Sequence, residues 1–88
     1  MTTTPDMFNA VDRRLTDYAR DGEADGSLSP IQANEVRQLR ANAGDITNDL
    51  WDSGRLIDNG SGTDPRYVVS DTDWHDFFQS GEYRKYLP

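Results

Sequence analysis

The side chains best suited to chemistry in this sequence are carboxylates, and three of them gather in one short stretch. Asp21, Glu23 and Asp25 alternate with small residues and are followed by Gly26. Calcium takes about six to eight oxygen ligands, and a glycine at this point permits the sharp turn that gathers them. The spacing therefore favours a site for a hard divalent cation. The simpler interpretation is an acidic turn between two helices.

The twelve residues from Asp21 to Gln32 resemble the calcium loop of an EF-hand. Acids stand at loop positions one, three and five, a glycine at six and an aliphatic residue at eight. The resemblance implies carboxylate ligands from Asp21, Glu23 and Asp25 and a carbonyl ligand from Ser27. At position twelve, Gln32 supplies a neutral amide where the EF-hand has a bidentate glutamate. The implied calcium affinity is therefore weak, about millimolar.

Catalytic chemistry has few candidates in the rest of the chain. The sequence has no cysteine, which excludes disulfides, thiolate metal sites and thiol nucleophiles. His75 is the only histidine, so a catalytic triad or a zinc site would need partners from carboxylates alone. The NGSG sequence at 59–62 lacks the lysine of a phosphate-binding loop. We therefore expect no enzymatic activity and no cofactor other than weakly bound calcium.

The charge balance narrows the choice of partner. The chain carries 9 basic and 16 acidic residues, for a formal net charge of −7. This excess argues against direct binding to nucleic acid or to an anionic membrane, because phosphate contacts need clustered cations. We expect a cytoplasmic protein, since no apolar run is long enough for a membrane span and no signal segment opens the chain. A salt-rich habitat would explain the same acidity without a functional surface.

Two groups of residues are candidates for contact with a protein partner. Asp45, Asp49 and Asp52 are spaced i, i+4 and i+7, so they share one face of a helix. The second group combines aromatic residues with an acidic rim near the C-terminus: Asp71, Asp73, Trp74, Asp76, Tyr83 and Tyr86. Exposed aromatic side chains would anchor a partner that has a basic groove. Buried ones would instead close the core over the helices.

In size and charge, the chain resembles the small acidic proteins that phages and mobile elements use against host machinery, such as anti-CRISPR proteins and nucleic-acid mimics. The resemblance implies a non-enzymatic inhibitor that blocks a basic surface of a host protein, in particular a nucleic-acid-binding one. The alternatives are the weak calcium-binding module and a structural subunit of an assembly. Self-association into a homo-oligomer is also open, because the apolar stripes of the helices are narrow.

These residues must be positioned by one small, mainly α-helical domain that spans 1–88. Apolar residues of the chain amount to 34%, which gives a thin core. A narrow apolar stripe that begins at Phe8 and ends at Tyr18 predicts a helix over about 6–20. It is followed by a loop over 21–28. Residues 1–5 are expected to be frayed.

The second arm of the predicted helical hairpin covers about 30–53. Ser29, Pro30 and Gln32 form the signature of a capping box at its start. The apolar rhythm continues through Gly44, which favours one long helix over a break at 42–44 with Asp45 as a new cap.

The remaining elements are short. Residues 55–70 predict a minimal β-hairpin around a flexible loop at 59–65, since 66–70 is the one strand-like run. Ser70 then caps a short aromatic helix over about 71–80, which Gly81 ends.

Overall fold

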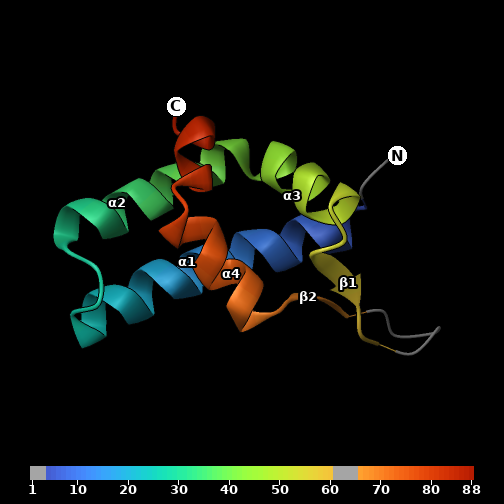
Figure 1. Cartoon of the computed structure of the whole chain (residues 1–88), viewed down its shortest axis with the longest axis horizontal. Coiled ribbons are helices and arrows are strands. Elements are labelled where there is room, and N and C mark those ends of the chain that lie inside the picture. Colours follow the sequence, from blue (N-terminus) through green and yellow to red (C-terminus); the bar gives the residue numbers. More distant parts are fainter. Residues whose placement is uncertain (1–3, 61–65) are drawn as a thin grey trace.

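A long first helix runs the length of the molecule, and shorter elements are arranged around it (Figure 1). The computed structural model describes residues 4–60 and 66–88. The mainly α-helical fold with a helical hairpin, a minimal β-hairpin and a short aromatic C-terminal helix is confirmed. In chain order the elements are α1 (Pro5–Asp25), α2 (Pro30–Gln38), the 3-10 helix η1 (Leu39–Asn42), α3 (Ala43–Asp52), β1 (Leu56–Asp58), β2 (Tyr67–Val69), α4 (Asp71–Gln79) and the 3-10 helix η2 (Glu82–Tyr86).

Helix α1 is longer than the sequence pattern predicts. It begins at Pro5, where the Thr4 hydroxyl accepts a hydrogen bond from the Met7 amide at 3.3 Å, so Thr4 and Pro5 are ordered and not frayed. Positions 1–3 of the predicted frayed segment lie outside the described residues. The predicted loop over 21–28 is wrong, because the helix continues to Asp25 and ends at Gly26 with φ of 81°.

The extension of α1 depends on a close contact at Gly22. The Leu28 amide donates to the Gly22 carbonyl at 3.0 Å, and the Leu28 side chain lies directly against the Gly22 backbone. A Cβ at position 22 would fall 2.5 Å from Leu28 Cδ1, which is closer than carbon atoms approach. Position 22 therefore favours glycine because a Cβ there would collide with the Leu28 side chain, and not because the backbone turns at this point.

The second arm is helical throughout but is not one helix. Its capping box is confirmed: the Ser29 hydroxyl accepts from the Gln32 amide at 3.1 Å, and the Gln32 side chain accepts from the Ser29 amide at 3.0 Å. The prediction of a single helix over 30–53 is wrong, because η1 separates α2 from α3. Asp45 does not cap the new helix; Asn42 stands at that position without a side-chain cap bond.

The break in the second arm has a tertiary cause. The Asn42 side chain donates to the backbone carbonyl of Tyr86 at 2.6 Å, and so it is held by η2 and does not cap α3. Both halves of the arm pack along α1, with α2 against one end of that helix and α3 against the other (Figure 1). The turn of 3-10 helix between them redirects the chain so that both halves keep this contact.

The core lies where α1 meets the second arm. Its residues from α1 are Met7, Val11, Leu15 and Ala19, and those from the second arm are Ala33, Val36, Leu39, Ala43, Ile46 and Leu50. The predicted stripe of α1 was therefore slightly misplaced. Phe8, which was assigned to it, is 39% exposed, and Tyr18 lies at its half-buried edge.

The two strands form the predicted antiparallel hairpin. Leu56 pairs with Val69, Ile57 with Val68, and Asp58 with Tyr67. Leu56 points into the core, whereas Ile57 and Val68 lie on the solvent side, because side chains alternate along a strand. The part of the predicted loop at 61–65 lies outside the described residues.

The C-terminal segment closes the core with rings. Ser70 caps α4 by accepting from the Asp73 amide at 3.1 Å, and Gly81 ends the helix with φ of 80°. Trp74 and Phe77 are buried against α1 and the second arm, and their rings stack with centroids 5.6 Å apart. Helix η2 then lies across η1 (Figure 1). The Asn42 side chain of η1 holds η2 in this place by donating a hydrogen bond to the backbone carbonyl of Tyr86.

Candidate functional site

The outer face of α3 carries the acidic row predicted from the sequence. Asp45, Asp49 and Asp52 are all exposed, on the side of the helix opposite to the buried Ile46 and Leu50. The spacing of i, i+4 and i+7 therefore does place three carboxylates on one helical face.

The arginines are distributed so that this row stays negative. The ion pairs are Arg14–Asp71, Arg20–Asp17, Arg20–Asp21, Arg37–Glu23, Arg40–Asp12 and Arg55–Glu82. Most of these arginines neutralise acids of α1. Within residues 4–60 and 66–88, Asp45, Asp49 and Asp52 form no ion pair with a basic side chain.

Asp49 has a neutral partner at the edge of the row. The hydroxyl of the buried Tyr86 donates a hydrogen bond to the Asp49 carboxylate. Burial raises the pKa of Tyr86, and the hydrogen bond to Asp49 and the charge of that carboxylate raise it further. The hydroxyl therefore stays protonated at neutral pH and remains a hydrogen-bond donor to Asp49.

A partly buried ion pair adjoins Asp49. The Arg55 guanidinium donates two hydrogen bonds to the Glu82 carboxylate, at 3.0 and 2.8 Å. These bonds are the main reason that the pKa of Glu82 is lowered, and the negative charge of Asp49 works against that lowering. Asp73 also interacts electrostatically with Arg55. Arg55 thus interacts with acids of η2 and α4, and Glu82 brings this pair close to Asp49 at one margin of the acidic row.

Two of the predicted partner-binding residues are not on the surface. Trp74 is 1% exposed and Tyr86 is 6% exposed, so both belong to the core and neither can anchor a partner. Tyr83 is half-buried, and Asp71 is exposed but bound to Arg14. Asp76 is exposed, while Asp73 is half-buried. The interpretation that the C-terminal rings close the core therefore holds for Trp74, Phe77 and Tyr86.

The acids of the EF-hand-like segment are not gathered around one point. Asp21 and Glu23 lie two residues apart in α1, so they point to different faces of that helix. Glu23 pairs with Arg37 at 2.9 Å, and Asp25 accepts a hydrogen bond from the Ser27 amide at 2.8 Å. The Gln32 side chain is used in the capping box. In the described part of the chain, no group of three or more His, Cys, Asp or Glu residues could hold a metal ion.

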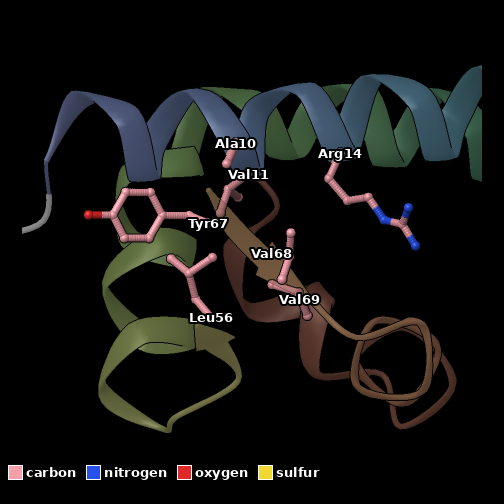
Figure 2. Close-up of a pocket in the computed structure, with 7 residues that line it drawn as sticks. All are labelled: Ala10, Val11, Arg14, Leu56, Tyr67, Val68 and Val69. Carbon is pink, nitrogen blue, oxygen red and sulfur yellow. The ribbon is translucent and has the colours of Figure 1, made fainter. Parts of the chain in front are cut away.

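The hollows in the surface were not expected from the sequence. One of them, of about 120 Å³, lies between α1 and the sheet and is lined by Ala10, Val11, Arg14, Leu56, Tyr67, Val68 and Val69 (Figure 2). In Figure 2 the Arg14 guanidinium points away from the other lining side chains. This guanidinium is bound to Asp71, which is not part of the lining. This hollow is therefore a gap between packed elements, with its charged group turned outward.

Two further hollows adjoin each other beside α1, because both are lined by Tyr18 and Ser27. The larger has a volume of about 310 Å³ and includes Phe78, Tyr83 and His75 in its lining. Tyr18 and Phe78 were not candidates in the sequence, since Tyr18 reads as core and Phe78 as part of an aromatic helix face. Only the fold brings these residues from α1, α4 and η2 together.

Comparison of the chain with protein-family models, with curated proteins and with solved structures gave no match in any of the three. None of the described helices is both long enough and apolar enough to cross a membrane.

Proposed function

We propose that this protein is a non-enzymatic inhibitor that blocks a basic, nucleic-acid-binding surface of a host protein in the cytoplasm, in the manner of phage anti-host proteins and anti-CRISPRs. The acidic row of α3 (Asp45, Asp49 and Asp52) is the contact surface. The observation that carries the proposal is the charge distribution. The row has no ion-pair partner within the described residues, although five arginines neutralise acids elsewhere on the chain.

The spacing of the row supports mimicry of a nucleic-acid backbone. A helix rises about 1.5 Å per residue, so seven residues place the three carboxylates within about 10 Å along the axis. One strand of duplex DNA carries a charge about every 3.4 Å of axis, or about four charges in the same length. The linear charge density of the row is therefore of the same order as that of a phosphate strand.

The rigidity of the row also supports the proposal. Ile46 and Leu50 anchor the other face of α3 in the core, and Tyr86 holds the central carboxylate of Asp49. A surface that is already ordered loses little conformational entropy when it binds. The net charge of −7 would also attract a basic partner over long range and accelerate encounter.

The test compares two variants of equal net charge. Asp45→Asn with Asp52→Asn removes both unpaired ends of the row but keeps Asp49, whose bond to Tyr86 supports the fold. Asp6→Asn with Glu35→Gln removes two charges from α1 and α2, where neither residue forms an ion pair within the described residues. Each protein is immobilised and used to capture partners from a nuclease-treated host lysate, and captured proteins are eluted with increasing salt.

The proposal predicts that the wild-type chain and the control variant retain a basic nucleic-acid-binding protein that elutes as salt screens the contact. The wild-type chain should also displace nucleic acid from that protein once both are purified. The Asp45/Asp52 variant should lose most of the capture and the displacement. Equal capture by both variants, elution that does not depend on salt, or failure to displace nucleic acid would each refute the proposal.

A further inference from the structure

A groove beside α1 combines an aromatic wall with an acidic neighbour. The wall is formed by Tyr18 of α1, Phe78 of α4 and Tyr83 of η2, and all three are half-buried. The Tyr18 and Phe78 rings are stacked with centroids 4.3 Å apart and planes 7° from parallel. The Phe78 and Tyr83 centroids are 5.4 Å apart. The three rings therefore form a continuous surface along the groove and leave part of each ring accessible.

The rest of the groove lining combines polar and apolar side chains with one histidine, His75. Ser27, Gln32 and Gln79 contribute amide or hydroxyl groups, and Leu28 and Val36 contribute apolar surface. Within the described residues no aspartate, glutamate, lysine or arginine lines this groove. A ligand in this groove therefore contacts rings and hydrogen-bonding groups, and the carboxylates lie outside the groove itself.

The neighbouring hollow supplies that charge. It shares Tyr18 and Ser27 with the groove and is lined by three acids, Asp17, Asp21 and Asp25, and by one base, Arg14. Arg14 is bound to Asp71, which lies outside this hollow. Asp17 and Asp21 are bound to Arg20, whereas Asp25 has no basic partner within the described residues. Burial, followed by the negative charge of Asp25, raises the pKa of Tyr18, which agrees with a carboxylate close to the Tyr18 hydroxyl.

We propose that this groove binds an arginine side chain of the basic partner, with the guanidinium against the aromatic wall and its charge facing Asp25. The inference rests on the proposed function in requiring a basic partner, but it uses a different surface. A guanidinium is planar and weakly hydrated, so it stacks on aromatic rings more readily than an ammonium group does. The groove should therefore prefer arginine to lysine through stacking on rings, a contact that the carboxylates of the acidic row of α3 do not offer.

One ring of the wall already contacts a guanidinium group within the chain, since Arg84 lies over the Tyr83 ring at 5.7 Å. Arg14 lies over the ring of Trp74, which is outside the wall, at 6.0 Å. Both contacts are made at the margins of the same aromatic cluster. An arginine from a partner would make a further contact of this kind, at the accessible part of the wall.

The test uses two capped peptides of equal charge, tetra-arginine and tetra-lysine, titrated into the full-length chain and followed by NMR of the aromatic ring resonances. The expected result is that tetra-arginine binds about two- to fivefold more tightly than tetra-lysine, because an exposed cation–π contact contributes about 0.5–1 kcal/mol. Ring resonances of Tyr18, Phe78 and Tyr83 should shift with tetra-arginine. Equal affinities, or rings that do not respond, would overturn the inference.

Four variants locate the contact. Tyr83→Leu removes one ring and keeps apolar bulk. Gln79→Arg places a competing guanidinium at the exposed rim without removing a core contact. In each variant the ratio of tetra-arginine affinity to tetra-lysine affinity should fall close to one. Asp25→Asn keeps an acceptor for the Ser27 amide and should weaken tetra-arginine binding more than Asp45→Asn does. An arginine preference that survives in Gln79→Arg would overturn the inference even if Tyr83→Leu fails to fold.

The two proposals can fail separately. If Asp45→Asn weakens both peptides equally while the ring resonances stay unchanged, the groove is excluded and the α3 surface stands. If the rings respond and discriminate arginine from lysine, but Asp45→Asn with Asp52→Asn leaves partner capture intact, the proposed role of α3 is excluded and the groove stands.

Discussion

The hydroxyl of Tyr86 donates a hydrogen bond to the carboxylate of Asp49, and this single contact joins the C-terminal η2 to the middle of α3. The backbone carbonyl of Tyr86 accepts from the Asn42 side chain at 2.6 Å, so the residue is held at two points. Asp49 is also the central member of the acidic row. The element that closes the core therefore also orders the surface to which we assign the function.

Replacing Tyr86 with phenylalanine should lower the free energy of unfolding by about 1–2 kcal/mol, because hydrogen bonds to charged groups contribute about 1.5–3 kcal/mol and this carboxylate is partly solvated. Urea denaturation at pH 7 measures the change. Tyr83→Phe is the matched control, since the Tyr83 hydroxyl makes no hydrogen bond to any described residue. Equal losses for the two variants would show that the contact with Asp49 contributes nothing specific.

The same contact predicts loss of stability at high pH. The pKa of Tyr86 is raised by burial first and then by Asp49, so the folded chain resists ionisation of this hydroxyl. The unfolded tyrosine ionises near pH 10. The stabilisation is therefore complete below about pH 10 and is lost as the pH rises further. Melting temperatures measured from pH 8 to pH 11 should fall less steeply for Tyr86→Phe than for the wild type, with a residual slope from Tyr18, whose pKa is also raised.

The Arg55–Glu82 pair predicts loss of stability at low pH. Because the pKa of Glu82 is lowered, mainly by hydrogen bonds from Arg55, this contribution is complete above the ordinary pKa of glutamate and is lost as the pH falls through the folded value. Glu82→Gln should lower the free energy of unfolding by about 1 kcal/mol at pH 7. The same substitution should have little effect at pH 3. Arg55 lies over the Phe77 ring, and the substitution leaves this contact in place.

Glu35→Gln provides the control for this experiment, since Glu35 forms no ion pair within the described residues. Its effect should stay within about 0.5 kcal/mol at both pH values. A Glu82→Gln deficit that persists unchanged at pH 3 would contradict the assignment to the ion pair.

The elements that were predicted correctly are those that local side chains specify. Any helix leaves backbone amides without partners at its start, and nearby side chains can accept from them. In α2 these side chains are Ser29 and Gln32, and in α4 the side chain is Ser70. The sequence around each cap is therefore enough to locate the start of the helix. The acidic row of α3 was predicted for the same reason, because helical spacing alone decides which residues share a face.

The elements that were predicted wrongly depend on residues far away in the chain or on close packing. The helix continues through Gly22 because Leu28 folds back onto it, and the second arm breaks because Asn42 is bound to Tyr86. The aromatic groove could not be predicted, since Tyr18 and Phe78 are brought together only by the packing of α4 on α1. No local pattern encodes these contacts.

The helical position of Asp21 and Glu23 predicts a weak response to calcium. A helix turns these two side chains away from each other, and Glu23 is bound to Arg37. Calcium binding would require α1 to unwind from about Asp21, which would also release Leu28 from Gly22. We expect the fluorescence of Trp51 and Trp74 and the melting temperature to be unchanged at about 10 mM calcium. Stabilisation by calcium that Asp21→Asn abolishes would contradict this expectation.

Two glycines with equally open surroundings should respond oppositely to alanine. A Cβ at Gly44 or at Gly54 would meet no atom within 4 Å, so neither substitution causes a clash. Gly44 lies within α3, whereas Gly54 follows that helix with φ of 78°. Gly44→Ala should therefore raise the free energy of unfolding by about 0.5–1 kcal/mol, through better helix propensity and a less flexible unfolded chain. Gly54→Ala should lower it by about 1–2 kcal/mol, because a side chain is strained in the left-handed region. Urea denaturation of both variants tests the boundary of α3: if Gly44→Ala destabilises the chain, the backbone at position 44 is not helical and the acidic row that begins at Asp45 is not presented as described.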